Sequence, residues 1–204
     1  VAFDRNLGAH IAQVSSDHAH GGELIADLLA STGACNVAIV GGPRAQFTDL
    51  SGSNTTFPTV RYVQTLEKCL SQAGIAHTYV ESGEVCDLDG VRRAVHGVFN
   101  AHPGIDAFVG ADLAAAFAMQ EATMRGIAVP GQLQIVAYDG TMAADCAGLP
   151  LTVVRQDFDA IAHALAGRIE TEITRFAGDA QSPMTQTPEP EIVPVTLEAR
   201  TTTR

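Results

Sequence analysis

The segment Asp17-His18-Ala19-His20 has residue types that could bind a metal ion, because it places two imidazoles close together. Two histidines alone do not make a metal site, since zinc takes about four ligands. A histidine pair in a loop ahead of a helix is more often part of the N-terminal turn of that helix. We therefore interpret this segment as a helix start, and we expect neither a metal ion nor any other cofactor.

Catalytic and nucleotide-binding motifs are missing from the sequence. Gly41-Gly42-Pro43 suggests a nucleotide-binding turn, but neither GxGxxG nor GxxxxGK[ST] surrounds it. Asp87 and Asp89 form a close carboxylate pair that is most simply a solvated helix cap. We find no GxSxG turn, no Ser/His/Asp set in a recognisable context and no paired-carboxylate motif. The sequence therefore predicts a protein that is not an enzyme.

Polar residues follow the ends of the predicted strands. Ligands of an open parallel sheet bind outside the carboxyl ends of its strands, where helix N-termini and loop side chains meet. Polar side chains that are far apart in the sequence can therefore form one site. The segments concerned are Asp4-Arg5, the loop at Gly41, the loop at Val85, Ala111-Asp112, Asp139 and Gln156.

The elements that would position these residues alternate between short apolar runs and amphipathic stretches, which is the pattern of β-α-β units. This pattern predicts the α/β class. Asp112 is a possible N-cap of a helix that ends before Gly126. The other expected helices cover about Gly21–Ser31, Thr59–Gln72, Leu88–Asn100 and Phe158–Phe176. The expected strands lie near Val1–Phe3, Asn36–Val40, His77–Val80, Ala107–Val109, Gln134–Ala137 and Thr152–Val154.

The composition limits the class of protein. Of the 204 residues, 46% are hydrophobic, enough for one core or for two small lobes that share a cleft. The formal net charge of −11 would repel a nucleic-acid backbone, so we do not expect this chain itself to bind DNA. No apolar run reaches the roughly 20 residues that span a bilayer. The four cysteines lack the spacing of a zinc site, and we expect a cytoplasmic protein without a membrane partner.

Seven motifs lie along almost the whole chain: VAFDR (Val1–Arg5), VSSDHAHGG (Val14–Gly22), VAIVGGP (Val37–Pro43), GADLAAAFA (Gly110–Ala118), GIAVPGQLQIVAYDG (Gly126–Gly140), LPLTVVRQ (Leu149–Gln156) and LEARTTT (Leu197–Thr203). In this order and spacing they resemble the effector-binding region of the lactose-repressor (LacI/GalR) family of bacterial transcription regulators. The resemblance implies a periplasmic-binding-protein-like fold, in which helices flank the parallel sheets of two Rossmann-like lobes. It also implies three crossover strands between the lobes, a small polar effector in the cleft, and a homodimer.

The resemblance also predicts how the chain is divided. Residues 18–155 with 188–204 would be one nearly complete C-terminal lobe, and residues 1–17 with 156–187 would be a remnant of the N-terminal lobe. The chain starts at Val1 without methionine, and we expect the helix-turn-helix domain of the family to be absent from it. Operator DNA would then be bound only through that domain.

The ligand contacts of the family fall on Asp4, Arg5, Asp139 and Gln156, all of which match its motifs. Carboxylates and the Gln156 amide accept hydrogen bonds from hydroxyl groups, whereas Arg5 donates several. The alternative for each is a helix cap or a hydrogen bond within a crossover strand. Three contacts of the family are altered here. Tyr62 stands where an arginine usually grips the ligand, with Arg61 as a possible substitute, while Ala111 replaces a common Asn and Val85 an aromatic residue.

The resemblance predicts an effector-sensing and dimerisation region that binds a sugar-like or nucleoside-like ligand and so modulates operator binding. The alternative is a sugar-binding protein of a transport system. Regulators of this type commonly end in an arginine followed by Ser or Thr, like Arg200-Thr201-Thr202, so the tail favours the regulator.

Overall fold

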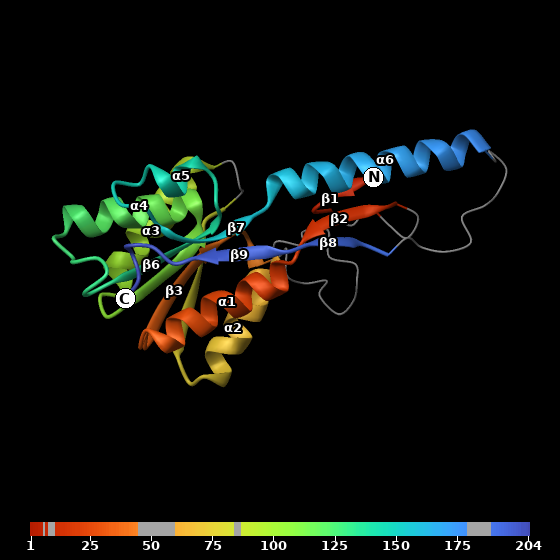
Figure 1. Ribbon diagram of the computed structural model, residues 1–204. Helices are drawn as coiled ribbons and strands as arrows, with labels where there is room; N and C mark the ends of the chain where they lie inside the picture. Colours follow the sequence, from red (N-terminus) through yellow and green to blue (C-terminus); the bar gives the residue numbers. More distant parts are fainter. Residues whose placement is uncertain (6, 8–10, 45–59, 84–86, 179–188) are drawn as a thin grey trace.

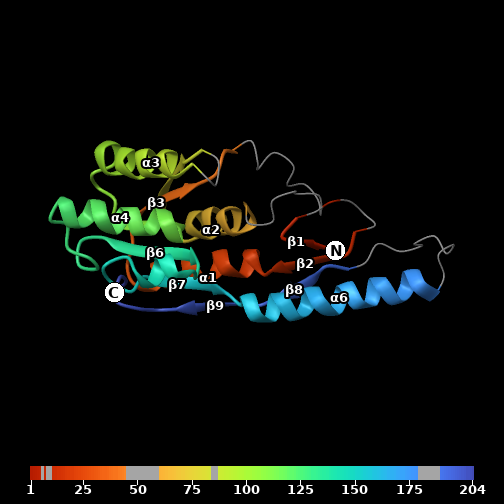
Figure 2. The same ribbon diagram turned by 90° about the horizontal axis from the view of Figure 1, so that it is seen from above.

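Two sheets form the framework of the protein (Figure 1). The computed structural model describes residues 1–204 except 6, 8–10, 45–59, 84–86 and 179–188. The larger sheet and its helices form a large lobe at one end of the molecule, and the smaller sheet with one long helix forms a small lobe at the other (Figures 1 and 2). Helices flank mostly parallel strands, which confirms the predicted α/β class.

The large sheet has the strand order β4-β3-β5-β6-β7-β9, in which only β9 is antiparallel to its neighbour. Strands that are buried on both faces need apolar side chains throughout, which explains their Val, Ile and Ala content. The chain leaves β3 first to one side and then to the other, and such a switch point opens a crevice at the carboxyl ends. The strands are β3 (Asn36–Gly41), β4 (Ala76–Glu81), β5 (Ala107–Ala111), β6 (Gln134–Asp139), β7 (Thr152–Gln156) and β9 (Val195–Glu198).

Helices cover both faces of the large sheet (Figure 1). One apolar core lies under α1 and α2 and includes Ile25, Leu66 and Tyr138. The other lies under α3 and α4 and includes Val95 and Phe108. The helices are α1 (His18–Ser31), α2 (Val60–Gln72), α3 (Leu88–Ala101), α4 (Asp112–Met124) and the short α5 (Met142–Asp145).

The small lobe contains β1 (Ala2–Phe3), β2 (Gln13–Ser16) and β8 (Glu191–Val193), all parallel in the order β1-β2-β8. The long helix α6 (Phe158–Gly178) packs on this sheet. Glu191–Val193 belongs to the small sheet, although the sequence-based division assigned it to the large lobe. The chain therefore enters the large sheet again only at Val195.

Within the described part of the chain, the backbone crosses between the two sheets three times. The crossings lie at Asp17 between β2 and α1, at Asp157 between β7 and α6, and at Pro194 between β8 and β9. A hydrogen bond of 2.8 Å from the Asp17 N–H to the Val193 carbonyl ties the first crossing to the third. No helix among the described residues has the length and apolar character that a membrane crossing requires.

Several predicted details needed correction. Asp112 does not cap α4, because Ala111 occupies the N-cap position and provides no side-chain hydrogen bond. The predicted helix start at Thr59 and the loop at Val85 lie outside the described residues. Asp87 caps α3 as expected and accepts a hydrogen bond from the Gly90 N–H.

Candidate functional site

Two of the predicted ligand contacts meet at the carboxyl ends of β6 and β7. The Gln156 amide donates a 2.8 Å hydrogen bond from Nε2 to Asp139 Oδ1. Its oxygen Oε1 accepts a 2.6 Å bond from the Ser16 hydroxyl. Ser16 is the last residue of β2, so this path joins the small sheet to the large one.

Asp4, a third predicted contact, lies on the small-lobe side of the same junction. Its side chain is buried, and its Oδ1 accepts hydrogen bonds from Ser15 Oγ at 2.7 Å and from the Ser16 N–H at 3.3 Å. His18 Nε2 lies 3.0 Å from the same oxygen. Burial raises the pKa of the Asp4 carboxyl, but the contacts with His18 and Ser15 outweigh it and hold the pKa below its usual value. Asp4 is therefore ionised at neutral pH.

The other ring nitrogen of His18 faces the large lobe. His18 Nδ1 lies 2.7 Å from the hydroxyl oxygen of Tyr138 in β6. The Tyr138 ring stacks on Tyr62 of α2, with 4.0 Å between the ring centroids and an interplanar angle of 9°. His18 is only 2% exposed and lies between the two lobes.

Asp139 has an unusual environment for a carboxylate. Burial and the nearby carboxylate of Asp112 raise its pKa, the hydrogen bond from Gln156 lowers it, and together they bring it to about 7. Its φ of 116° lies in the left-handed region, which Asp and Asn tolerate better than other non-glycine residues. Asp139 is therefore partly protonated near neutral pH.

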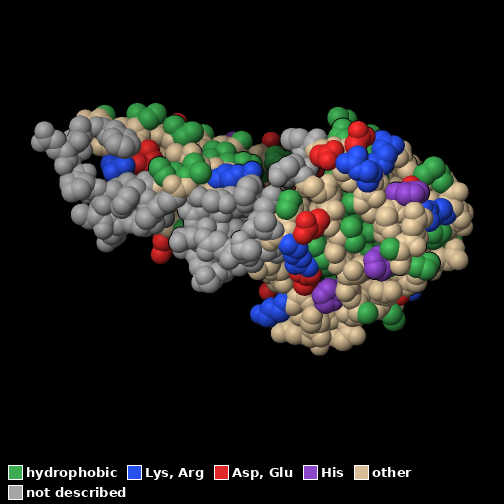
Figure 3. Space-filling view, turned by 180° about the vertical axis from the view of Figure 1, so that it is seen from behind, with side chains coloured by type: hydrophobic (Ala, Val, Ile, Leu, Met, Phe, Trp, Pro, Cys, Tyr) green, Lys and Arg blue, Asp and Glu red, His purple; other side chains and the backbone are tan. Residues whose placement is uncertain are grey.

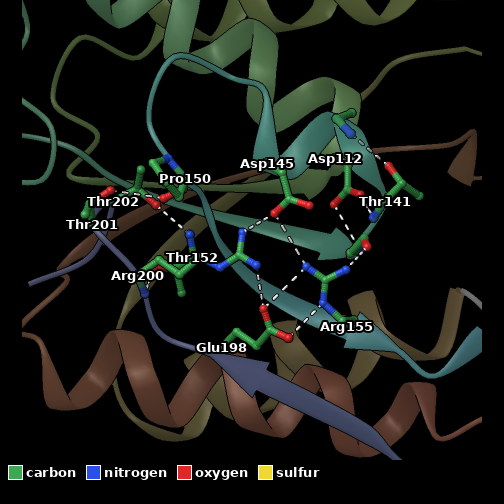
Figure 4. Close-up of polar contacts among 12 residues, drawn as sticks. Asp112, Thr141, Asp145, Pro150, Thr152, Arg155, Glu198, Arg200, Thr201 and Thr202 are labelled. Atoms are coloured by element: carbon green, nitrogen blue, oxygen red, sulfur yellow. Dashed lines mark hydrogen bonds and ion pairs between the residues drawn. The ribbon is translucent and has the colours of Figure 1, made fainter.

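The loop after β6 is held from two sides (Figure 4). Asp112 accepts hydrogen bonds from the Gly140 N–H at 3.3 Å and from the Thr141 N–H. Arg155 donates to the Gly140 carbonyl, and its Nε lies 2.8 Å from Glu198 Oε1. This explains why Asp112 does not act as a helix cap, since its carboxylate fixes the backbone that follows Asp139.

An ionic cluster extends from Arg155 and Glu198 towards the C-terminal tail (Figure 4). Arg200 makes ion pairs of 2.6 Å with both Asp145 and Glu198. Thr202 is fully buried and accepts a 2.8 Å hydrogen bond from the Thr152 N–H. The tail motif that resembles the regulator family is therefore packed into the large lobe.

The other residues predicted to contact the ligand lie outside this hydrogen-bonded junction. Arg5 is exposed and donates a 2.8 Å hydrogen bond to the Asp4 carbonyl. Tyr62 is 7% exposed and contributes to the core through its stack on Tyr138. Arg61 is exposed on the first turn of α2, and Ala111 is exposed at the end of β5.

Sequence reasoning missed Ser16, His18 and Tyr138 as parts of this junction. Ser16 could have been found as one more polar strand end, but β2 itself was not predicted. The arrangement offers hydroxyl, amide and carboxylate groups for hydrogen bonds with a polar molecule. Among the described residues, no group of three or more His, Cys, Asp or Glu side chains could hold a metal ion.

Comparison with known proteins identifies the fold. The model of the periplasmic binding protein-like domain matches residues 26–203. The sucrose operon repressor of Streptococcus mutans is 32% identical over 166 residues, which are 81% of this chain and 48% of the repressor. The ribose operon repressor of Halalkalibacterium halodurans is 27% identical over 157 residues, covering 76% of this chain and 44% of the repressor. The chain thus spans about half the length of these curated relatives.

A solved structure shows the same fold. The complex of the transcriptional regulator CelR with cellobiose superimposes with a TM-score of 0.76 at 22% sequence identity. The match covers 98% of this chain and 57% of that chain.

Proposed function

Because this chain belongs to the periplasmic binding protein-like domain family, we propose that it is the effector-sensing region of a LacI-type transcription regulator. A small polar molecule binds between the two lobes and changes their arrangement, which alters operator binding by a segment outside this chain. The relatives are operon repressors and transcriptional regulators, not enzymes, and they support a binding role without catalysis. As a regulator the protein acts in the cytoplasm.

The observation that carries the proposal is the junction of Ser16, Gln156 and Asp139. It brings polar side chains from both sheets to the carboxyl ends of the parallel strands, where open α/β sheets bind ligands. Asp4 and Asp139 would accept hydrogen bonds from hydroxyl groups, and Gln156 would donate or accept. We propose Arg5 and Arg61 as further contacts because both are exposed, and Tyr62 as a support of the site through Tyr138.

We expect a sugar to bind at this junction and Asp139→Asn to weaken its binding roughly tenfold to a hundredfold. In asparagine an NH₂ group, which only donates, replaces one carboxylate oxygen. It cannot accept the hydrogen bond that a sugar hydroxyl would donate to Asp139. Titration calorimetry with sucrose, ribose and cellobiose measures the affinities. Asp27→Asn is the matched control, because Asp27 is exposed on α1. Equal affinities of the Asp139→Asn variant and the wild type would contradict the proposed site, and no binding of any sugar would contradict the proposed ligand class.

We also propose that the protein forms a homodimer. Apolar side chains are exposed along α6. They include Phe158, Ile169 and Ile173, of which Ile173 is 63% exposed. Figure 3 shows that hydrophobic side chains also lie on the rear of the small lobe. Exposed apolar side chains that gather on one helix favour an interaction surface.

We expect light scattering to give the mass of a dimer at micromolar concentration, and Ile173→Glu to shift it towards the monomer. Met124→Glu is the control, because Met124 is equally apolar and 72% exposed but lies on α4 in the large lobe. A wild-type monomer at high concentration would disprove self-association. Equal effects of both variants would disprove the assignment to α6.

A further inference from the structure

Two hydrogen-bonded paths connect the small lobe to the end of β6. The first runs from Ser16 through Gln156 to Asp139. The second runs from Asp4 through His18 to Tyr138. Tyr138 and Asp139 are the last two residues of β6. The end of one strand is therefore tied to the small lobe by two separate paths.

The hydrogen bond between His18 and Asp4 has a fixed direction. An ionised carboxylate only accepts hydrogen bonds, so His18 Nε2 carries the proton that is donated to Asp4. In the neutral ring Nδ1 is then the acceptor, and the Tyr138 hydroxyl donates to it. Both ring nitrogens of this buried side chain are used, one towards each lobe.

The backbone conformation of Asp4 makes its contact with His18 important. Its φ of 43° lies in the left-handed region, which is costly for a residue with a Cβ and persists only where surrounding contacts hold it. The contacts that hold its carboxylate come from Ser15, Ser16 and His18. Ser15 and Ser16 lie in β2 of the small lobe, so among the described residues His18 is the only direct partner of this carboxylate that comes from the large lobe.

We propose that His18 is a positioning residue for effector binding, which holds the Asp4 carboxylate of the small lobe at a fixed place relative to Tyr138 of the large lobe. This inference rests on the proposed function, because Asp4 is an effector contact only there. In this role His18 fixes the position of the small-lobe side of the site relative to the large-lobe side, and it does not contact the effector itself.

A double-mutant cycle tests the link directly. Asp4 and Tyr138 are connected through His18, so Asp4→Gly and Tyr138→Phe should be coupled in the unfolding equilibrium by about fivefold or more. Glycine is chosen because it tolerates the left-handed backbone of Asp4. In a His18→Phe background the coupling should fall to less than about twofold. The control cycle pairs Asp4→Gly with Tyr79→Phe, which removes a hydroxyl that donates to the Gly42 carbonyl, and it should show no coupling.

Coupling that is absent from the wild-type background, or that persists without His18, would overturn the proposal. If His18→Phe does not fold, nitrogen NMR of labelled histidine decides. We expect the Nε2–H tautomer of His18, an Nδ1 shift that changes in Tyr138→Phe, and an Nε2 shift that changes in Asp4→Gly. The opposite tautomer or unchanged shifts would overturn the link.

The effect on the site is measured with whichever of sucrose, ribose or cellobiose binds the wild type. His18→Gln should weaken its binding about tenfold, whereas His20→Gln should leave it unchanged, because His20 is exposed and pairs with Glu23. Unchanged binding in His18→Gln would overturn the positioning role. The cycle and the NMR measurement use no sugar, so a failure of the sugar panel contradicts the proposed function and leaves the link between the lobes standing.

Discussion

Replacing Gly22 with alanine is expected to destabilise the large lobe by about 3 kcal/mol. Gly22 lies on α1 where α1 meets α2, and an added Cβ would stand 2.3 Å from the Tyr62 carbonyl oxygen and 2.9 Å from the Leu66 nitrogen. Both are backbone atoms, so no side-chain rotation relieves the clash and the two helices must separate. Separation would disturb the core below them, including Leu66 and the Tyr62 stack on Tyr138.

Gly97→Ala is the matched control, because Gly97 is also inside a helix but an added Cβ there meets nothing within 4 Å. Alanine should stabilise α3 by about 0.5–1 kcal/mol, since it restricts the unfolded chain and favours the helix. Urea unfolding followed by circular dichroism measures both changes. If both substitutions changed the free energy of unfolding in the same direction, Gly22 would not be needed for the close approach of α1 and α2.

Asp139→Asn is expected to remove most of a pH dependence of stability between about pH 4 and pH 7. The folded pKa of Asp139 is about 7, whereas its ordinary value is 3.8. In this window the native state holds a proton that the unfolded state has lost, so the free energy of unfolding falls as the pH rises. At pH 8 the loss reaches at most about 4 kcal/mol, at about 1.36 kcal/mol for each pKa unit. Asparagine never ionises, so the variant should be more stable than the wild type at pH 8.

The substitution changes little else, because asparagine tolerates a positive φ and keeps an oxygen for Gln156. Burial also raises the pKa of Asp112, so a smaller slope of the same sign should remain in the variant. Thermal unfolding between pH 4 and pH 8 measures the slopes. Asp27→Asn, on the exposed face of α1, should keep the slope of the wild type. A wild type whose stability rises steadily from pH 4 to pH 7 would contradict the expected protonation of Asp139.

The sequence predicted the elements whose patterns are local. Helices α3 and α6 have apolar residues at helical spacing and were predicted to within two residues at each end. The strands β3, β5 and β6 are mostly apolar runs and were also found, as was the less apolar edge strand β4. Strands β2 and β8 were missed because they are short and consist of QVSS and EIV. Such segments become strands through pairing with each other, which no local pattern reveals.

Some residues of the candidate site could likewise be predicted from local sequence, and others could not. Asp139 and Gln156 were predicted because polar residues at strand ends are visible in the sequence, and they do meet. His18 was interpreted only as part of a helix start, because its partner Tyr138 is 120 residues away. Asp112 was predicted to cap α4 because an aspartate between a strand and a helix fits that role. Its partners, the amides of Gly140 and Thr141, lie in a distant turn that the sequence does not connect to it.

Pro194 limits how the two lobes could turn against each other. A rigid-body rotation has to be absorbed by torsion angles at the three crossings, Asp17, Asp157 and Pro194. The proline ring fixes φ near about −65°, so the third crossing offers fewer free torsions than the other two. The hydrogen bond between Asp17 and Val193 keeps two of these pivots at a constant spacing. We therefore expect the two lobes to rotate about one preferred axis and not freely in all directions.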